Sequence, residues 1–231
     1  MKANLPLLFI ISAIHPISAF AAGAWIEGRE AFNTASEQHE FVLRGGYNFD
    51  GGAGIMLTNA YNTGKLDQFK HSYNELEGWY PLFKPTTEFT VSPALILTDN
   101  ADGSTVSPYV DFNYKFIPDF NVTLRYRYNN KNYDSVDLNG SKNKDSTHQF
   151  VMYWNLKINE EWAYTFEPDY FIHVKDFHSK NGKDHNWELN NKLTYTLTPR
   201  WKPYVEASWL DRWSQYEREQ YRFRVGIRYY F

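Results

Sequence analysis

Five arginines occur in two groups whose members are two or four residues apart. Arg125 and Arg127 form one group, and Arg222, Arg224 and Arg228 form the other. A guanidinium group is planar and permanently charged, and it binds a carboxylate through two parallel hydrogen bonds. Residues two apart along a β-strand point to the same side. Each group therefore predicts a row of cations on one strand face, suited to holding acidic groups.

Other charged residues are expected on the same wall as these arginines. They include both signs of charge, so two interpretations stay open. The arginine rows could guide an acidic solute, or the charges could pair with one another to stabilise a narrow polar interior. The candidate lining residues added to the two groups are Arg44, Lys192, Glu75, Glu77 and Asp111.

Catalytic and metal-binding signals in the sequence are weak. The chain has no cysteine, which removes disulfides, thiolate metal ligands and a cysteine nucleophile. Ser146 and His148 share a strand face, and His178 is followed directly by Ser179. Neither pair reproduces a known nucleophile motif with its fixed local order, and no histidine or acid spacing is typical of zinc. We expect no cofactor.

The elements that carry the arginines alternate with a period of two. In Tyr221–Phe231 every second residue is apolar or aromatic, and the intervening set carries the three arginines. The same division recurs along segments of nine to eleven residues. Such lengths match a tilted membrane strand better than the five or six residues common in soluble sheets.

Twelve such segments are predicted. The connections after even-numbered segments are mostly tight, and those after odd-numbered segments are mostly longer and more hydrophilic, as in outer-membrane barrels. On a closed ring of twelve, the seventh segment, with Arg125 and Arg127, lies nearly opposite the twelfth and first. The expected ranges are 24–33, 38–49, 53–62, 71–83, 88–98, 105–116, 120–130, 146–158, 162–175, 186–197, 202–212 and 219–231.

The composition supports a strand-based membrane protein. Aromatic residues make up 19% of the chain, although the mean hydropathy is only −0.61. Alternation reconciles the two values, and aromatic girdles at the two membrane interfaces account for the excess of rings. Trp79, Tyr80, Trp162 and Trp201 stand beside the predicted short turns, where such a girdle is expected. The formal net charge of −3 argues against a nucleic-acid partner.

The N-terminus reads as an export signal. Lys2 precedes a short apolar stretch, and Ala19 and Ala21 provide small residues at a cleavage site. We predict that residues 1–21 are a cleaved signal peptide and that 22–231 form an outer-membrane domain. Every backbone polar group in hydrocarbon must be paired, so this domain should be a closed, antiparallel, twelve-stranded β-barrel with its arginines facing the lumen.

Several longer stretches resemble the oligogalacturonate-specific porin family. They cover most of the mature chain and include Arg29–Asn33, Gly46–Asn59, Asn74–Thr86, Tyr164–Pro168 and Trp209–Arg212. The resemblance implies a monomeric twelve-stranded barrel that passes small, often acidic, sugars and oligosaccharides. It also implies facing basic rows in the pore, and the five arginines of the two groups occupy matching places.

Two other classes of function remain as alternatives. One is a barrel enzyme similar to the outer-membrane phospholipases, and the other is a non-conducting adhesion or structural barrel. The modest loop lengths favour a diffusion channel for small hydrophilic solutes in the outer membrane of a Gram-negative cell. The terminal Phe231 resembles the signal read by the barrel assembly machinery, which is the expected protein partner besides the lipid bilayer.

Overall fold

The computed structural model describes residues 23–63, 68–134, 144–174, 181–211 and 219–231. The predicted signal peptide, residues 1–21, lies outside these ranges. Within them, no helix is long and apolar enough to cross a membrane. All the regular structure that is described consists of β-strands.

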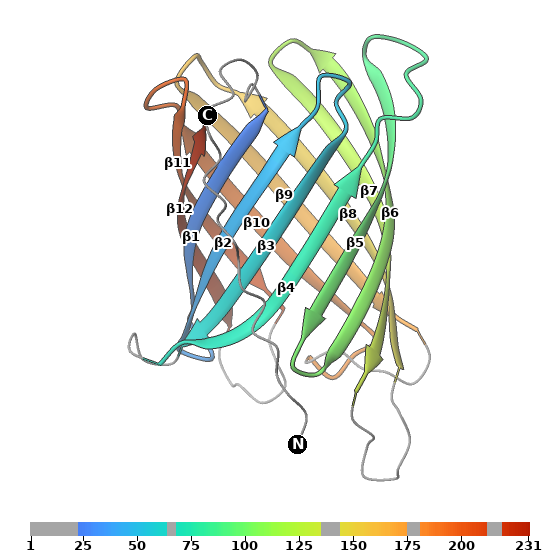
Figure 1. The fold of residues 1–231 in the computed structure, drawn as a ribbon, viewed down its shortest axis with the longest axis vertical. Coiled ribbons are helices and arrows are strands. Elements are labelled where there is room, and N and C mark those ends of the chain that lie inside the picture. Colours follow the sequence, from blue (N-terminus) through green and yellow to red (C-terminus); the bar gives the residue numbers. More distant parts are fainter. Residues whose placement is uncertain (1–22, 64–67, 135–143, 175–180, 212–218) are drawn as a thin grey trace, which may run out of the picture.

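Twelve antiparallel strands close into one barrel, as predicted. Each strand pairs with its neighbours in sequence, and β1 also pairs with β12 to seal the ring (Figure 1). The strands are β1 Ala24–Asn33, β2 Gln38–Asn48, β3 Gly54–Thr63, β4 Lys70–Trp79, β5 Phe89–Asn100, β6 Gly103–Ile117, β7 Phe120–Tyr133, β8 Lys144–Lys157, β9 Trp162–His173, β10 His185–Tyr195, β11 Trp201–Leu210 and β12 Gln220–Tyr230.

The strands have two unlike faces because the side-chain period is two. On β12, Phe223 and Val225 face outward and remain 50% and 53% exposed, whereas the side chain of Arg224 between them is 13% exposed on the inside. An exposed apolar band around a closed sheet matches a hydrocarbon environment, where ladder pairing satisfies the backbone. The predicted orientation of the last strand is therefore the observed one.

Short turns at one rim are fixed by side chains that accept backbone hydrogen bonds. Thr86, Asn159 and Thr198 each accept N–H groups from the residues two and three positions ahead, at 2.8–3.3 Å. Asx and Ser/Thr turns of this kind hold a chain reversal without further packing. They set the start of β5, β9 and β11.

Two connections differ from the expected lengths. β4 ends at Trp79, so nine residues, 80–88, connect it to β5 where a tight turn was predicted. Pro81 lacks an N–H for the ladder, which favours an early end to the strand. Conversely, β5 and β6 are joined by two residues only, because the side chain of Asn100 accepts the N–H groups of Asp102 and Gly103. Gly103 has a φ of +144°, which suits glycine.

The aromatic girdle prediction holds for three residues and fails for one. Tyr80, Trp162 and Trp201 are 58%, 36% and 42% exposed at the short-turn rim. Trp79 instead shares the inner face of β4 with Glu77, and its ring lies where a side chain on Gly54 would stand. A glycine on the neighbouring strand makes room for the indole, so Trp79 packs against Gly54 and does not join the outward-facing rings.

The same arrangement at Trp25 yields a matched pair of test substitutions. A Cβ at Gly46, on the inner face, would stand 2.5 Å from the Trp25 ring, while one at Gly45, on the outer face, would be 3.9 Å from its nearest neighbour. We expect Gly46→Ala to lower stability by about 1–3 kcal/mol through overpacking, and Gly45→Ala to have little effect. The temperature at which the folded band is lost on heating in SDS gels measures both. Equal melting of the two variants would contradict this packing.

Candidate pore and its charged lining

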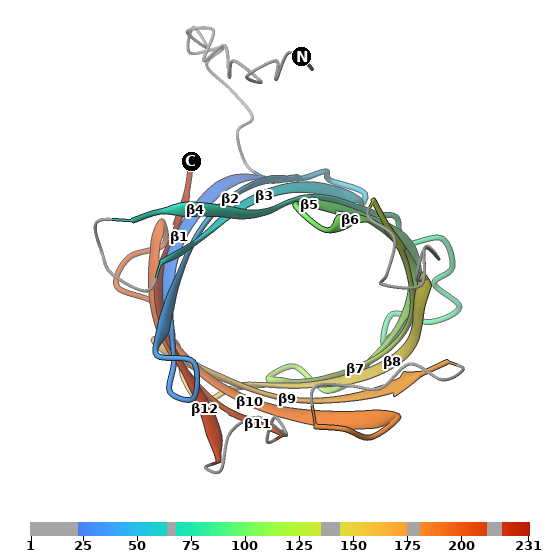
Figure 2. The same ribbon diagram turned by 90° about the horizontal axis from the view of Figure 1, so that it is seen from below.

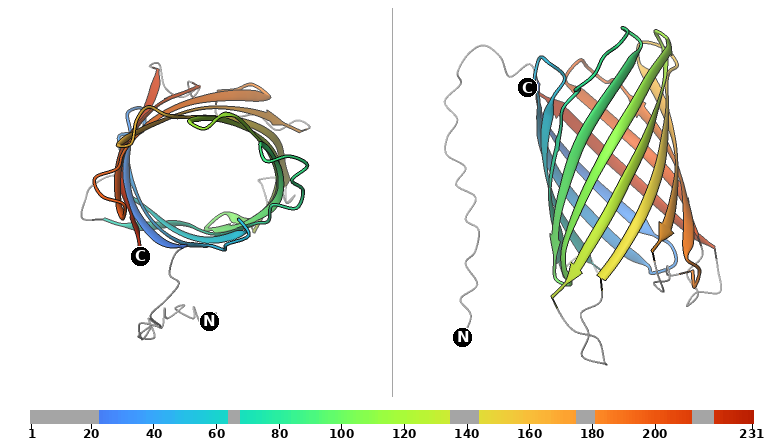
Figure 3. Two further views of the ribbon diagram at one scale, coloured as in Figure 1. Left: turned by 90° about the horizontal axis from the view of Figure 1, so that it is seen from above. Right: turned by 90° about the vertical axis from the view of Figure 1, so that its right-hand side faces the viewer.

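The barrel encloses a polar cavity of about 630 Å³. Seen along its axis, the strands form an oval ring around it (Figures 2 and 3). Nine of the ten predicted site residues line this cavity, and the tenth, Asp111, contacts it only through a partner arginine. The nine are Arg44, Glu75, Glu77, Arg125, Arg127, Lys192, Arg222, Arg224 and Arg228.

Glu27 holds together the arginines beside the closing seam. This carboxylate is 3% exposed, and Arg228 of β12 donates to it from Nη2 at 2.6 Å and from Nε at 2.8 Å. Arg44 Nη1 lies 3.7 Å away, and Tyr204 Oη donates at 3.0 Å. One buried acid thus serves two cations from opposite sides of β1.

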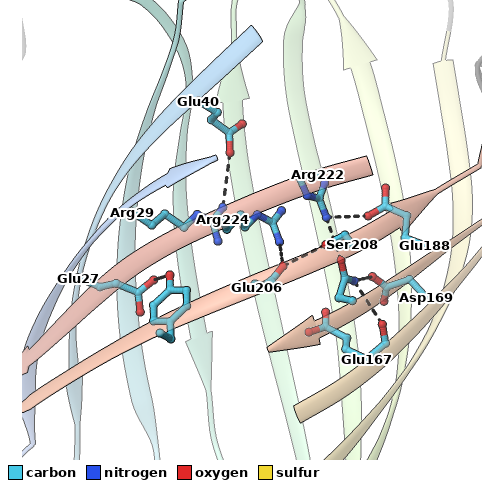
Figure 4. A network of polar contacts seen from close by, with 12 residues as sticks. Glu27, Arg29, Glu40, Glu167, Asp169, Glu188, Glu206, Ser208, Arg222 and Arg224 are labelled. Atoms are coloured by element: carbon cyan, nitrogen blue, oxygen red, sulfur yellow. Dashed lines mark hydrogen bonds and ion pairs between the residues drawn. The ribbon is translucent and has the colours of Figure 1, made fainter. Parts of the chain in front are cut away.

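The remaining arginines of this wall also have acidic partners (Figure 4). Arg222 Nη2 donates to Glu188 Oε2 and to Asn190 Oδ1, both at 3.1 Å. Arg224 pairs with Glu206 one strand away. Arg29 points inward and lies 3.6 Å from Glu40. The wall formed by β12, β1 and β2 is therefore cationic but heavily compensated.

Arg125 occupies a tight site on the opposite wall. Its Nε and Nη2 donate to the two oxygens of Asp111 at 2.7 and 2.8 Å, a bidentate pair. Its Cζ lies 3.8 Å from the centre of the Tyr109 ring, a cation–π contact, and Nη1 is 4.0 Å from Glu77. The geometry makes Arg125 a stabilising part of the wall.

Arg127 is different because its partner is neutral. Its Nε donates to Gln149 Oε1 at 2.7 Å, and no ion pair within 4.0 Å joins it to an acid in the described part of the chain. A cation paired with an amide keeps its full charge toward the cavity. Arg127 is therefore the residue of this wall best placed to attract an anion.

The acids along the lining nearly balance the cations. Nine basic and seven acidic side chains border the cavity. Glu75 accepts a hydrogen bond from Thr98 Oγ1 at 3.2 Å, and Glu167 and Asp169 project from β9. Two further acids, Asp111 and Glu40, pair with the lining residues Arg125 and Arg29, so the lumen carries strong local fields of both signs that are close to balance.

Sequence reasoning placed the arginine rows but missed much of their support. Three residues that support the arginines were not named from the sequence: Glu27, its hydrogen-bond donor Tyr204, and Gln149, the partner of Arg127. Each of them falls on the inner face by simple alternation. The two-residue period of the strands already predicted that these side chains face the lumen. What alternation lacks is the register between strands, which decides which inward residues touch.

Among the described residues, the candidate catalytic side chains do not form a nucleophile site. His148 faces outward, and its Nδ1 lies 2.8 Å from Tyr126 Oη on the neighbouring strand. His178 and Ser179 lie outside the described residues. Among the described side chains, no group of three histidines or acids is placed to hold a metal ion.

A closed barrel with an apolar exterior and a charged interior is the architecture of an outer-membrane channel. Residues 17–231 match the model of the oligogalacturonate-specific porin protein family, KdgM. The chain belongs to this family, as its sequence resemblance indicated. It is an outer-membrane porin.

Relatives of known name agree with this assignment. The chain is 26% identical over 214 residues to the N-acetylneuraminic acid outer membrane channel protein NanC of Escherichia coli, covering 88% of this chain and 89% of that protein. It is 29% identical over 160 residues to the oligogalacturonate-specific porin KdgM of Dickeya dadantii, covering 65% and 64%.

Solved structures share the fold. A NanC porin structure superimposes with a TM-score of 0.78 at 23% identity, over 89% of this chain and all of the other. A KdgM porin structure gives 0.66 at 22% identity, over 90% and 99%. These similarities support the twelve-stranded barrel independently of the strand pattern in the sequence.

Proposed function

We propose that this porin passes small acidic sugars and short acidic oligosaccharides by passive diffusion. The observation that carries the proposal is Arg127, a cation without an acidic partner among the described residues, facing the arginine wall of β12, β1 and β2 across the lumen. Relatives named for oligogalacturonate and for N-acetylneuraminic acid support an acidic solute. Guanidinium groups on two walls can each bind a carboxylate as the solute passes.

The acidic side chains in the lining limit how strongly the pore should prefer anions. Most arginines already hold a carboxylate, so a passing solute competes with internal partners and is not trapped. Conduction needs binding that is weak enough to allow exit. A lining whose arginines already hold carboxylates therefore suits the rapid passage of one solute after another.

Other features complete the proposal. Residues 1–21 are removed on export, and the mature domain, 22–231, works as a monomer without a cofactor or a catalytic step. Phe231, 59% exposed and hydrogen-bonded through its N–H to Ala24 O at 3.2 Å, ends the chain at the rim where β1 begins. It is the residue we expect the barrel assembly machinery to recognise.

Liposome swelling with the purified mature porin tests the proposed solute class. We expect digalacturonate to enter faster than a neutral disaccharide of similar size, by about two- to fivefold, because Arg127, whose partner is neutral, attracts a carboxylate. Empty liposomes are the control for leakage. Equal exclusion of both sugars, together with an absence of conducting steps in planar bilayers, would refute a pore.

A further inference from the structure

Charges of both signs border the lumen, and the acids without a close ion pair lie between two groups of cations. Cations gather on β12, β1 and β2, and again on β7. Acids that have no ion pair within 4.0 Å in the described part of the chain lie between them, Glu75 on β4 and Glu167 and Asp169 on β9. Arg29, Arg127 and Asp169 all stand near the middle of their strands, so these groups face one another across the cavity.

The part of the wall around β9 crowds three carboxylates together. Glu167 and Asp169 are two residues apart on the inner face, and Glu188 of β10 is paired in register with Asp169. Arg222 pairs with Glu188 at 3.1 Å, whereas among the described residues neither β9 acid has an ion pair within 4.0 Å, although Lys192 of β10 also borders the cavity. Close like charges repel, and a cation that enters the cavity beside them would relieve that repulsion.

Asp169 has an unsatisfied oxygen at this place. The residue is 5% exposed, its Oδ2 accepts from Asn190 Nδ2 at 3.2 Å, and its Oδ1 is buried with no hydrogen-bond partner. A buried acceptor without a donor is costly, so such atoms point to a missing group. A donor with a positive charge would satisfy both the oxygen and the local field.

The neighbouring arginine wall has buried hydrogen-bond donors that lack acceptors. The Nε atoms of Arg29, Arg44, Arg222 and Arg224 are buried without hydrogen-bond partners, although their outer nitrogens are paired. Asn190 connects the two walls, because it accepts from Arg222 and donates to Asp169. The residues that carry these buried unused donors and this buried unused acceptor line one cavity.

We propose that the lumen takes sugars that carry both an amine and a carboxylate. The ammonium group lies at Glu167 and Asp169, and the carboxylate lies on the arginines. This inference rests on the proposed function and narrows its solute class. An organic ammonium fits better than a metal ion, since the described residues provide no group of three metal ligands.

Muramic acid and N-acetylmuramic acid make a pair of probes that differ at one position, because acetylation removes the amine charge and adds a small acetyl group. In liposome swelling with the full mature porin, we expect muramic acid to enter about fivefold faster than its acetylated form, an ordinary effect for partly buried charge pairs. In a Glu167→Gln/Asp169→Asn variant this ratio should fall close to one. Entry of galacturonic acid should be kept or increased, because the arginine wall is unchanged.

A Glu160→Gln/Glu161→Gln variant is the control, since it removes two acidic charges at the exposed β8–β9 turn and should keep the wild-type ratio. If the lumen variant does not fold, Glu167→Gln alone provides the comparison. An unchanged ratio in a channel that admits galacturonic acid would overturn this inference alone. A wild-type channel that excludes galacturonic acid and both muramic acids would overturn the proposed function and this inference with it.

Discussion

The Arg127→Glu variant should shift the reversal potential of the channel in a salt gradient toward the value for cations. The substitution changes the lumen charge by two units at a side chain whose partner is the neutral Gln149. We expect the cation-to-anion permeability ratio to rise by about an order of magnitude, as charged pore walls set local ion concentration. Planar-bilayer recordings give the ratio directly.

The matched control for this measurement is Arg200→Glu. Arg200 is exposed in the β10–β11 turn and does not border the cavity, so the same charge change should leave the reversal potential almost unchanged. If Arg127→Glu behaves like Arg200→Glu, the β7 arginines do not govern permeation. Their role would then be confined to holding the wall together.

The architecture could be predicted from the sequence because few backbone arrangements are stable in a membrane. A strand such as Tyr221–Phe231, apolar on one side and cationic on the other, must bury its backbone in a closed ladder. Twelve repeats of that pattern fix the ring. The errors came at strand ends, where Pro81 ended β4 early and the side chain of Asn100 tightened the β5–β6 turn. Such ends depend on local hydrogen bonds that alternation does not encode.

The sequence predicted which side chains line the site but not which of them contact one another. Alternation correctly places Arg222 and Arg224 toward the lumen, but it does not give the neighbours that each arginine meets. Those depend on register, and the register sets Glu206 opposite Arg224 and Glu27 opposite Arg228. A row of like charges in a narrow, poorly hydrated interior needs counter-charges. The structure provides them from adjacent strands, which is why the rows are less open than the arginines alone suggest.

Ion pairing inside the barrel also links solute passage to stability. Arg125 and the seam arginines hold their carboxylates tightly, whereas Arg127 leaves its charge free. A wall can therefore be rigid at some positions and attractive to solutes at others. Substitutions at the first kind of position should affect folding, and those at the second kind should affect permeation.

The Glu27→Gln variant should show the largest loss of stability in the molecule. Glu27 is 3% exposed and stands opposite Arg228 across the β1–β12 seam, with Arg44 on its other side. An amide of the same size leaves two half-buried guanidinium groups without this counter-charge, and removing one partner of a buried pair costs about 3–5 kcal/mol. Unfolding by denaturant in lipid vesicles, followed by tryptophan fluorescence, measures the change.

A double variant distinguishes pairing from packing at this seam. In Glu27→Gln/Arg228→Gln one of the two unpaired cations is removed, so part of the stability should return, whereas Glu161→Gln at an exposed turn should stay within about 0.5 kcal/mol of the wild type. If Glu27→Gln unfolds like the wild type, backbone pairing alone holds β1 to β12. If Glu27→Gln is destabilised and the double variant regains part of the lost stability, the charge pair at the seam is what keeps the barrel closed around its lumen.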